Sequence, residues 1–551
     1  MVVDVPTWSL DRPLTYRVPP ALVGAAVLGA VVRVPLHGRR VRGWVVGPAD
    51  PAATPAPGDL QDVAGVSGSG LVFDAALLSA ARALARRSVH PLSTFLRLLT
   101  PPQMGRRMTR AAPDGPLGGP LAVTRRPLAS QRKVLRRLGP TEDPVAVYEP
   151  AIRSVVESGR GVLVVLPVVR TGARVVEGLT EALGDQAAVV HSDQSDAARS
   201  RALWAAARGR CPVILGGRGS VFAPAFDLGL IIVHAEDDWT LKAESAPYFD
   251  ARDVAELRAG ASGAELWLAS VTPSVRSWHR ASRGRWERVQ PAVDRWPAVV
   301  CAPPLGRVMS EPAVAAILAA RAAGTRVLIH VPRVQGTAAG PGPAEVAKYV
   351  ARVAPNARIG IAQADGSPPE ALDADIVVAT PGGLREVQQP VGAVVVLGVD
   401  ARLRWPSGST VEEAFGVLWR LGAVAAQSDL PGRMVLETEQ PHHHAVRAVI
   451  DGDYDLFLRQ ERAARRATAS PPFVTLARVR GAALGDATVS QLGALPGTEV
   501  FGPMGGRQGP EVLLKIEDPE AVLDELRGVV AASSKGRGAE RLVVEMEPRD
   551  W

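Results

Sequence analysis

Continuously apolar runs alternate with helical periodicity through the middle of this chain. Runs such as Val162–Leu166 and Leu228–Val233 are almost wholly apolar, and amphipathic segments with helical spacing separate them. Strands that are apolar along their whole length are buried on both faces, and their alternation with helices is typical of parallel β-sheets covered by helices. The pattern starts near residue 143 and begins again near Trp296, so it predicts two α/β halves in sequence.

The two ends of the chain follow other patterns. Near the start, strand-like runs at 31–36 and 41–47 flank a short turn. After about Met434, short strands interleave with helices expected at 453–467 and 519–531. We therefore expect a β-rich module at the N-terminal end and a small α+β module at the C-terminal end.

These changes of pattern divide the chain into five predicted segments. A stretch rich in Gly and Pro at 111–120 indicates a linker, and a short helix is expected around Val134 and Leu135. The predicted segments are a β-rich domain at 1–104, a linker region at 105–142, a first α/β lobe at 143–290, a second α/β lobe at 291–433 and an α+β domain at 434–551.

Composition adds a weak preference for an anionic partner. The formal net charge is +7 and the pI about 9.8, which suits nucleic acid, although this excess is thin over 551 residues. Two cysteines, Cys211 and Cys301, are too few for a disulfide framework or a cysteine-based zinc site. Neither a signal peptide nor an apolar run of about 18 residues is visible, so we expect a cytoplasmic protein that does not contact the membrane.

Five stretches in collinear order resemble the primosomal protein N′ family, whose members are PriA-type replication-restart helicases. The resemblance implies a 3′-DNA-binding domain, a reduced winged-helix region at 105–142, two RecA-like helicase lobes and a C-terminal domain. It also implies DNA forks, other primosome proteins and the replicative helicase as partners. The five stretches are Asp11–Pro19, Val34–Gly47, Gly216–Pro224, Ala246–Ala255 and Gly452–Phe473.

An ATP-driven motor needs a Gly-x-x-x-x-Gly-Lys-Ser/Thr loop to cradle the phosphates, and this chain has none. None of its five lysines follows a glycine. The loop is expected before Val162–Leu166, where Asp143–Ile152 stands instead. Family members also carry Asp-Glu-x-His after the strand that matches Leu228–Val233. The aligned residues here are His234, Ala235, Glu236 and Asp237, so they are predicted to form a degenerate nucleotide site.

Two further family features are missing from the second lobe. The arginine fingers of the family align with Val424 and Gln427. The zinc-binding insertion is reduced to the few residues between Pro332 and Pro343. We therefore expect no ATPase or helicase activity, no zinc and no other bound metal, although the family uses both ATP and zinc.

Two groups of residues are candidates for DNA contact. Near the N-terminus the candidates are Tyr16, in the stretch Asp11–Pro19, and the hairpin residues Gly38, Arg39, Arg40 and Arg42. In the hairpin, a turn glycine lets the backbone approach a phosphate and the arginines supply charge. The family aspartate that precedes the tyrosine is absent here, so recognition of a 3′ end is looser or lost. A basic helix offers a second group, for which a solvated surface is an equal alternative: Arg459, Arg462, Arg465 and Arg466.

The sequence therefore supports three hypotheses. The first is a non-hydrolysing restart factor that binds stalled or branched forks and helps to reload the replicative helicase. The second is an active ATP-dependent 3′→5′ DNA helicase with an unorthodox site. The third is a protein–protein adaptor that no longer binds DNA.

Overall fold

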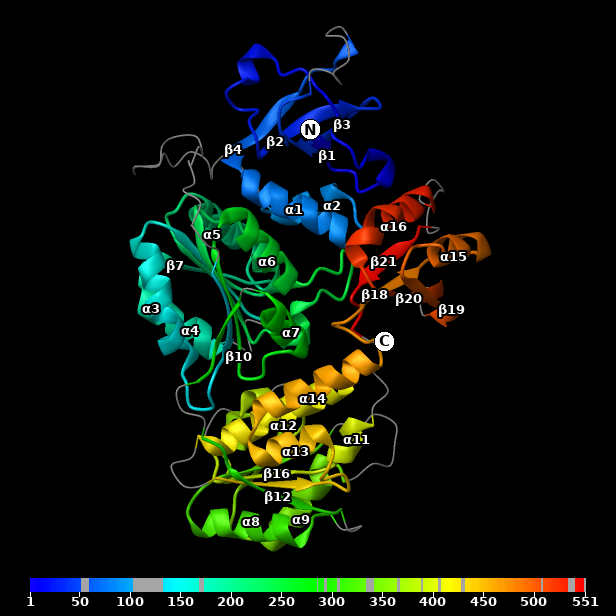
Figure 1. Cartoon of the computed structure of the whole chain (residues 1–551). Coiled ribbons are helices and arrows are strands. Elements are labelled where there is room, and N and C mark those ends of the chain that lie inside the picture. Colours follow the sequence, from blue (N-terminus) through cyan, green and yellow to red (C-terminus); the bar gives the residue numbers. More distant parts are fainter. Residues whose placement is uncertain are drawn as a thin grey trace.

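Four β-sheets, each in its own part of the chain, make up the computed structural model. Figure 1 shows the N-terminal part at one end, lobe 2 at the other, and lobe 1 beside the C-terminal domain between them. The structure describes residues 1–50, 59–102, 132–167, 173–284, 286–291, 295–304, 308–332, 341–363, 367–387, 390–404, 408–427, 432–506, 509–533 and 541–549. The predicted linker at 111–120 lies outside the described residues.

The N-terminal part is a small antiparallel sheet followed by two helices. Its strands run in the order β1-β3-β2-β4, and the β2–β3 turn consists of His37 (φ 48°) and Gly38 (φ 77°). Two successive positive φ angles define the tight hairpin that a glycine favours. The elements are β1 (Val2–Val3), β2 (Ala30–Leu36), β3 (Arg39–Trp44), β4 (Gly65–Leu71), α1 (Ala75–Arg87) and α2 (Leu92–Leu99).

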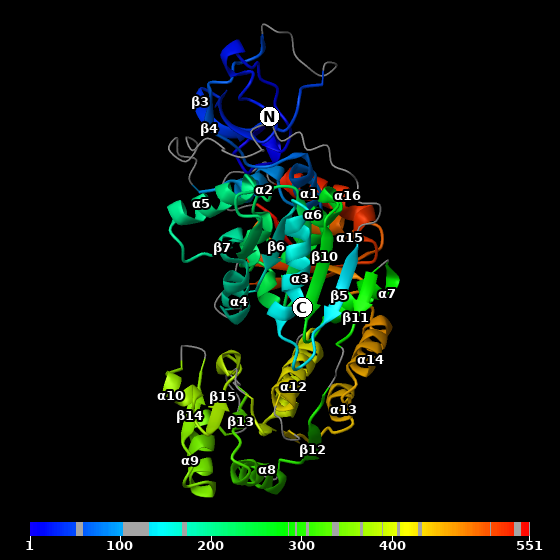
Figure 2. The ribbon, with the colours of Figure 1, turned by 90° about the vertical axis from the view of Figure 1, so that its left-hand side faces the viewer.

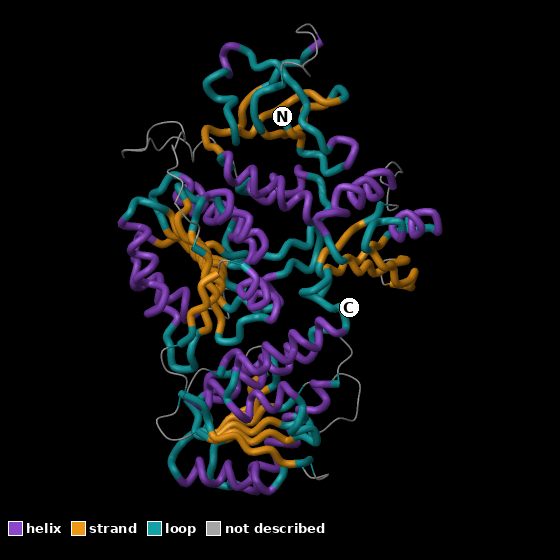
Figure 3. Tube along the Cα trace, in the orientation of Figure 1, coloured by secondary structure: helices purple, strands orange, loops and turns teal. Residues whose placement is uncertain are grey.

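Lobe 1 is a seven-stranded parallel sheet, in the order β11-β5-β10-β9-β6-β8-β7, with helices on both faces (Figure 3). Its strands are β5 (Lys133–Arg137), β6 (Gly161–Val165), β7 (Ala187–Val190), β8 (Val213–Gly216), β9 (Leu228–His234), β10 (Glu265–Ser270) and β11 (Trp286–Val289). Its helices are α3 (Pro144–Glu157), α4 (Ala173–Leu183), α5 (Asp196–Ala207), α6 (Ala251–Ser262) and α7 (Val275–Arg283).

Strand β5 corrects two sequence predictions. Val134 and Leu135 were expected in a helix, but β5 pairs with β10 and β11 inside the lobe-1 sheet. Both side chains are almost fully buried, which favours an extended segment covered on both faces. Lobe 1 therefore begins before the expected boundary at residue 143.

Lobe 2 is a six-stranded parallel sheet in the order β12-β17-β16-β13-β15-β14. Its strands are β12 (Ala298–Ala302), β13 (Val327–His330), β14 (Ile359–Ala362), β15 (Ile376–Ala379), β16 (Ala393–Val396) and β17 (Arg433–Glu437). Its helices are α8 (Glu311–Ala322), α9 (Pro343–Val353), α10 (Pro369–Leu372), α11 (Val399–Leu403), α12 (Thr410–Ala426), α13 (His444–Asp451) and α14 (Tyr454–Ala467).

The end of lobe 2 also differs from the predicted boundary at residue 433. Strand β17 pairs with β12 and β16, so it belongs to the lobe-2 sheet. Helix α14 packs on α12 through stacked rings, with 3.7 Å between the ring centroids of Phe415 and Phe457. The pattern change near Met434 marks a strand of lobe 2 rather than a new domain. Helices α12 and α14 cover the side of lobe 2 that faces lobe 1 (Figure 2).

The C-terminal domain is an antiparallel βαββαβ unit with the strand order β19-β20-β18-β21. Its elements are β18 (Thr475–Arg480), α15 (Asp486–Gly493), β19 (Thr498–Gly506), β20 (Gly509–Ile516), α16 (Pro519–Ser533) and β21 (Val543–Met546). The predicted α/β fold class, with two lobes between a β-rich and an α+β domain, is confirmed. Within the described ranges, no helix has both the length and the apolar character needed to cross a bilayer.

The two ends of the chain are joined to each other. Arg527 of α16 donates to the carboxylate of Asp11 (2.8 Å) and to the carbonyl oxygens of Ala85 and His90 (2.6 and 3.2 Å), and its guanidinium lies over the ring of Trp8. Because one guanidinium bonds to a carboxylate and two carbonyl oxygens at once, it fixes the orientation of α16 relative to α1 and to the segment around Asp11. The N-terminal part is therefore fixed to the C-terminal domain as well as to lobe 1.

Replacing Arg527 with alanine should loosen this junction. The substitution leaves the Asp11 carboxylate and two carbonyls without their donor, which costs about 1–3 kcal/mol for partly buried groups. We expect hydrogen exchange in α16 to become about tenfold faster or more, while exchange in lobe 2 stays unchanged. Arg541→Ala, at an exposed arginine of the same domain, is the matched control; equal effects of the two variants would contradict this role.

Candidate inter-lobe site

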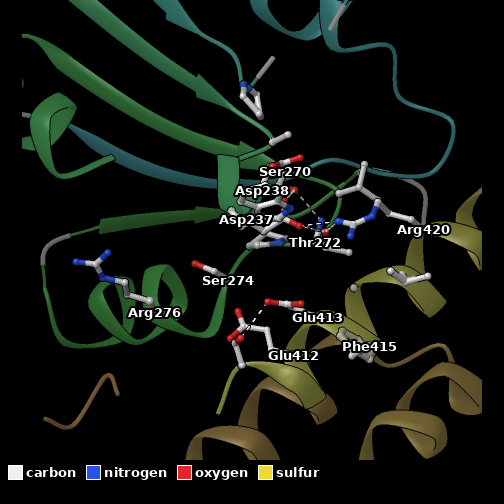
Figure 4. A pocket seen from close by; sticks show the side chains of 18 of the residues that line it. Asp237, Asp238, Ser270, Thr272, Ser274, Arg276, Glu412, Glu413, Phe415 and Arg420 are labelled. Carbon is white, nitrogen blue, oxygen red and sulfur yellow. Dashed lines mark hydrogen bonds and ion pairs between the residues drawn. The ribbon is translucent and has the colours of Figure 1, made fainter. Parts of the chain in front are cut away.

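A cavity of about 850 Å³ lies where lobe 1, lobe 2 and the C-terminal domain meet. It opens at the carboxyl ends of β9 and β10, the edge of a parallel sheet at which ligands bind. Figure 4 shows carboxylate and hydroxyl side chains of lobe 1 facing acidic and arginine side chains of α12 across it. This is the position at which the sequence placed a degenerate nucleotide site.

His234 ends β9, where the family has its metal-binding aspartate. The hydroxyl of Tyr148 and the Nδ1 atom of His234 are 2.8 Å apart. Burial lowers the pKa of His234 to about 4, so the imidazole is neutral near pH 7. Ala235 follows with a φ of 48° and offers no side-chain oxygen. The end of β9 therefore presents a neutral ring and a methyl group to the cavity.

Glu236 is turned away from the cavity into the protein. Its side chain is fully buried and accepts hydrogen bonds from the Ser274 amide (2.5 Å) and the Ser277 hydroxyl (2.7 Å), at the N-terminus of α7. Burial raises the pKa of this carboxyl. A carboxylate at a helix N-terminus satisfies otherwise unpaired amides. Glu236 thus fixes α7 and does not line the cavity.

Asp237 lines the cavity but is already bonded. It accepts hydrogen bonds from Ser270 and from Thr272 (2.7 Å) in lobe 1, and it forms an ion pair of 2.6 Å with Arg420 of α12 (Figure 4). Arg420 also donates to the Thr272 hydroxyl at 2.8 Å. The sequence did not identify Arg420, because the arginine fingers of the family align with Val424 and Gln427 and not with position 420.

The loop between β5 and α3 occupies the position of a phosphate-binding loop, earlier in the chain than the sequence suggested. The predicted replacement segment forms most of α3. The Glu142 carboxylate accepts from the Gly139 amide (2.8 Å), and the Asp143 carboxylate accepts from the Val145 amide (3.0 Å). One amide of this loop and one amide at the N-terminus of α3 are therefore already bonded to carboxylates of the chain itself.

Several hydrogen bonds cross directly from lobe 2 to lobe 1. Glu412 of α12 accepts from the Val275 amide of α7 at 2.8 Å, and the Tyr454 hydroxyl donates to the Pro273 carbonyl at 2.6 Å. The Gln427 side chain donates to the Pro140 carbonyl at 2.9 Å. Contacts within the chain thus join the two lobes directly around the cavity.

The basic face of α14 is largely used inside the protein. Arg465 is buried and pairs with Glu461 and Glu412, both at 2.8 Å, so the structure contradicts its predicted contact with DNA. Arg462 donates to His279 of lobe 1 at 3.0 Å. The other two arginines are exposed: Arg459 pairs with Asp453, and Arg466 lies over the ring of Phe473.

The candidates of the N-terminal hairpin lie together at the far end of the molecule from α14 (Figure 1). The Tyr16 hydroxyl donates to the Pro35 carbonyl at 3.0 Å, next to the turn that contains Gly38. Arg39 and Arg40 are exposed, and Arg42 is ion-paired with Asp4 at 2.5 Å. The structure therefore separates the two predicted DNA-contact groups.

No group of three or more His, Cys, Asp and Glu side chains in the described parts of the chain is arranged to hold a metal ion. The site of the missing zinc insertion includes residues 333–340, which lie outside the described residues.

Comparison with known proteins agrees with the sequence resemblance. Residues 1–101 match a family model described as the 3′DNA-binding domain (3′BD) of PriA. The replication restart protein PriA of Bacillus subtilis is 24% identical over 410 residues, which are 60% of this chain and 51% of the relative. That of Treponema pallidum is 28% identical over 311 residues, 52% of this chain and 46% of the relative. The chain spans about half the length of these curated relatives.

Solved helicase structures give weaker matches. RecG bound to a three-way DNA junction is 13% identical, with a TM-score of 0.39, over 60% of this chain and 43% of that one. Yeast Dbp5 bound to RNA and ADP BeF3 is 12% identical, with a TM-score of 0.38, over 60% of this chain and 84% of that one. The match of the N-terminal domain and the sequence relatives carry the assignment: the chain belongs to the family of PriA replication-restart proteins.

Proposed function

We propose that this protein is a replication-restart factor that binds stalled or branched DNA forks and helps to reload the replicative helicase without hydrolysing ATP. Its partners would be fork DNA, other primosome proteins and the helicase, in the cytoplasm. The observation that carries the proposal is the pair of carboxylates, Glu142 and Asp143, at the head of α3. They stand where a motor of this family needs a cationic phosphate cradle.

Phosphoryl transfer requires positive charge around the β- and γ-phosphates and a carboxylate that holds magnesium. A triphosphate at the head of α3 would meet the Glu142 and Asp143 carboxylates, which already accept from the Gly139 and Val145 amides. The basic residue beside them, Arg136, is already paired with Glu142 at 3.4 Å. The end of β9 offers a neutral His234 and an alanine in place of carboxylates. A nucleotide would therefore lose its phosphate contacts and gain repulsion. These features favour the hypothesis that the protein does not use ATP over the hypothesis that it is a helicase with an unorthodox site.

The direct contacts between the two lobes also support a protein that does not hydrolyse ATP. A motor converts nucleotide binding into opening and closing of two lobes. Here Arg420 and Glu412 bond directly to lobe 1, so the closed arrangement needs no ligand. We infer that the lobes form a rigid body that holds the N-terminal domain in place.

Purified protein should hydrolyse ATP at the rate of a no-enzyme blank, with or without forked DNA. The missing lysine, magnesium ligand and arginine fingers leave no group to stabilise the transition state, and one finger alone is typically worth about 10³–10⁵ in rate. The measurement is phosphate release across the fractions of a final size-exclusion column. DNA-stimulated turnover that follows the protein peak would support the helicase alternative instead.

Arg420→Ala should loosen the lobes. The substitution leaves the Asp237 carboxylate without a charged donor, at about 1.5–3 kcal/mol for a hydrogen bond to a charged group. We expect exchange of the Thr272 and Val275 amides to become roughly tenfold faster, and wild-type exchange to be unaffected by an ATP analogue.

Arg404→Ala is the matched control, since Arg404 is an arginine of the same lobe whose ion pair with Glu439 stays within lobe 2. Strong protection of the wild-type amides that appears only when the ATP analogue is present would show a nucleotide-operated cleft and contradict the rigid-body proposal.

Forked DNA should bind with an affinity that falls as salt rises, because the contacts are to backbone phosphates. Fluorescence anisotropy with a labelled fork, titrated between low and moderate salt, measures this. A full absence of binding at low salt would favour the adaptor alternative.

A further inference from the structure

A row of arginines lies on the exposed half of one face of the N-terminal sheet. In the β2–β3 hairpin, Arg33 is directly opposite Arg42, and Arg40 is opposite Pro35. Directly paired residues of antiparallel strands project to the same face. The three arginines therefore share one face and all are exposed.

The other half of this face is buried. Trp44, Val31 and Val2 are paired in adjacent strands, are nearly inaccessible and belong to the apolar core that contains α1 and α2. The Trp44 indole donates to the Thr100 hydroxyl just after α2. One half of this face thus packs against α1 and α2, and the other half, which carries the arginines, is exposed to solvent.

Asp4 brings a fourth arginine to the same place. Its carboxylate accepts from Arg42 on one oxygen and from Arg97 of α2 on the other, at 2.7 and 2.8 Å. The carboxylate is 11% exposed, whereas the side chains of Arg42 and Arg97 are 40% and 49% exposed. The Asp4 carboxylate is therefore largely covered, and it orients two guanidinium groups that stay partly exposed.

This arrangement costs free energy in the isolated protein. Like charges directly opposite each other destabilise a sheet, and Asp4 neutralises only part of the charge. Among the residues that the structure describes, no carboxylate pairs with Arg33 or Arg40. A polyanion that approached this face would be attracted by four cations and would relieve their mutual repulsion.

The chemistry of the face favours backbone phosphates over bases. Proteins that bind single strands without sequence preference stack bases on exposed aromatic rings. The large aromatic ring on this face, Trp44, is fully buried. A face that offers guanidinium groups without exposed rings is suited to phosphodiester oxygens, and duplex DNA presents these along two backbones.

We propose that this arginine face, formed by Arg33, Arg40, Arg42 and Arg97, binds backbone phosphates of a duplex arm of the fork. It adds Arg33 and Arg97 to the hairpin candidates Arg40 and Arg42, and it does not depend on Gly38 or on Tyr16, whose hydroxyl is directed to the backbone of β2. The inference rests on the proposed function, since it names the DNA element that one face of this protein contacts.

The test is Arg33→Ala/Arg40→Ala, because neither side chain holds the fold together through an ion pair in the described structure. Binding is measured by anisotropy on blunt duplex and on a single strand of the same length, between 50 and 200 mM salt. Each lost phosphate contact lowers the slope of log affinity against log salt by about 0.9, so the double variant should lose about 1.8 on duplex. Duplex affinity at 0.1 M salt should fall by more than about tenfold.

Two further variants complete the design. Asp4→Asn removes the one carboxylate of the face and should tighten duplex binding, a gain that a damaged fold cannot produce. Arg174→Ala, at an exposed arginine on α4 of lobe 1, controls for the loss of a surface positive charge away from the arginine face and should leave duplex binding unchanged.

The outcomes separate the two proposals. A wild-type protein that binds no DNA overturns the proposed function itself. Wild-type binding that survives Arg33→Ala/Arg40→Ala with its salt slope intact overturns the arginine face but leaves DNA binding standing. A loss confined to the single strand, or an equal loss in Arg174→Ala, overturns the assignment to duplex phosphates.

Discussion

The ion pair between Asp237 and Arg420 joins the two lobes, and the arrangement of the whole molecule depends on it. It lies at the carboxyl edge of the lobe-1 sheet, where a motor of this family holds its nucleotide. Because Glu412, Tyr454 and Gln427 also bond to lobe 1 beside it, lobe 2 is held at several points of the same edge. The N-terminal part and the C-terminal domain are docked on lobe 1 and on each other, so this edge is the main junction between lobe 2 and the rest.

Much of the fold could be predicted from the sequence, because buried parallel strands leave continuous apolar runs. Val162–Leu166 and Leu228–Val233 were recognisable for this reason. Strand β5 was missed, since basic residues, Lys133 on one side and Arg136 and Arg137 on the other, flank an apolar core of only two residues. The end of lobe 2 was missed as well: β17 enters its sheet next to β12, and sequence patterns do not reveal which distant strands pair.

The candidate site was predicted in composition but not in arrangement. The resemblance to the family motif placed His234 to Asp237 at one site, and the structure sends Glu236 inward and Asp237 outward. Which of two adjacent carboxylates faces a cavity depends on the backbone angle at Ala235, which no periodicity encodes. Arg465 was predicted on a basic surface, but α14 also packs against α12, so one of its four arginines had to be buried.

The hydrogen bond between Tyr148 and His234 has a consequence for how this chain can change in evolution. An aspartate at position 234 would enter a pocket built for a neutral ring, beside a tyrosine whose pKa burial already raises. It would find no metal partner until Ala235, the loop before α3 and the finger positions had changed too. Each intermediate would carry an uncompensated buried charge. On the proposal that this chain hydrolyses no ATP, a return to the carboxylate pair of the family would need several simultaneous substitutions, and single substitutions could refine only the scaffold.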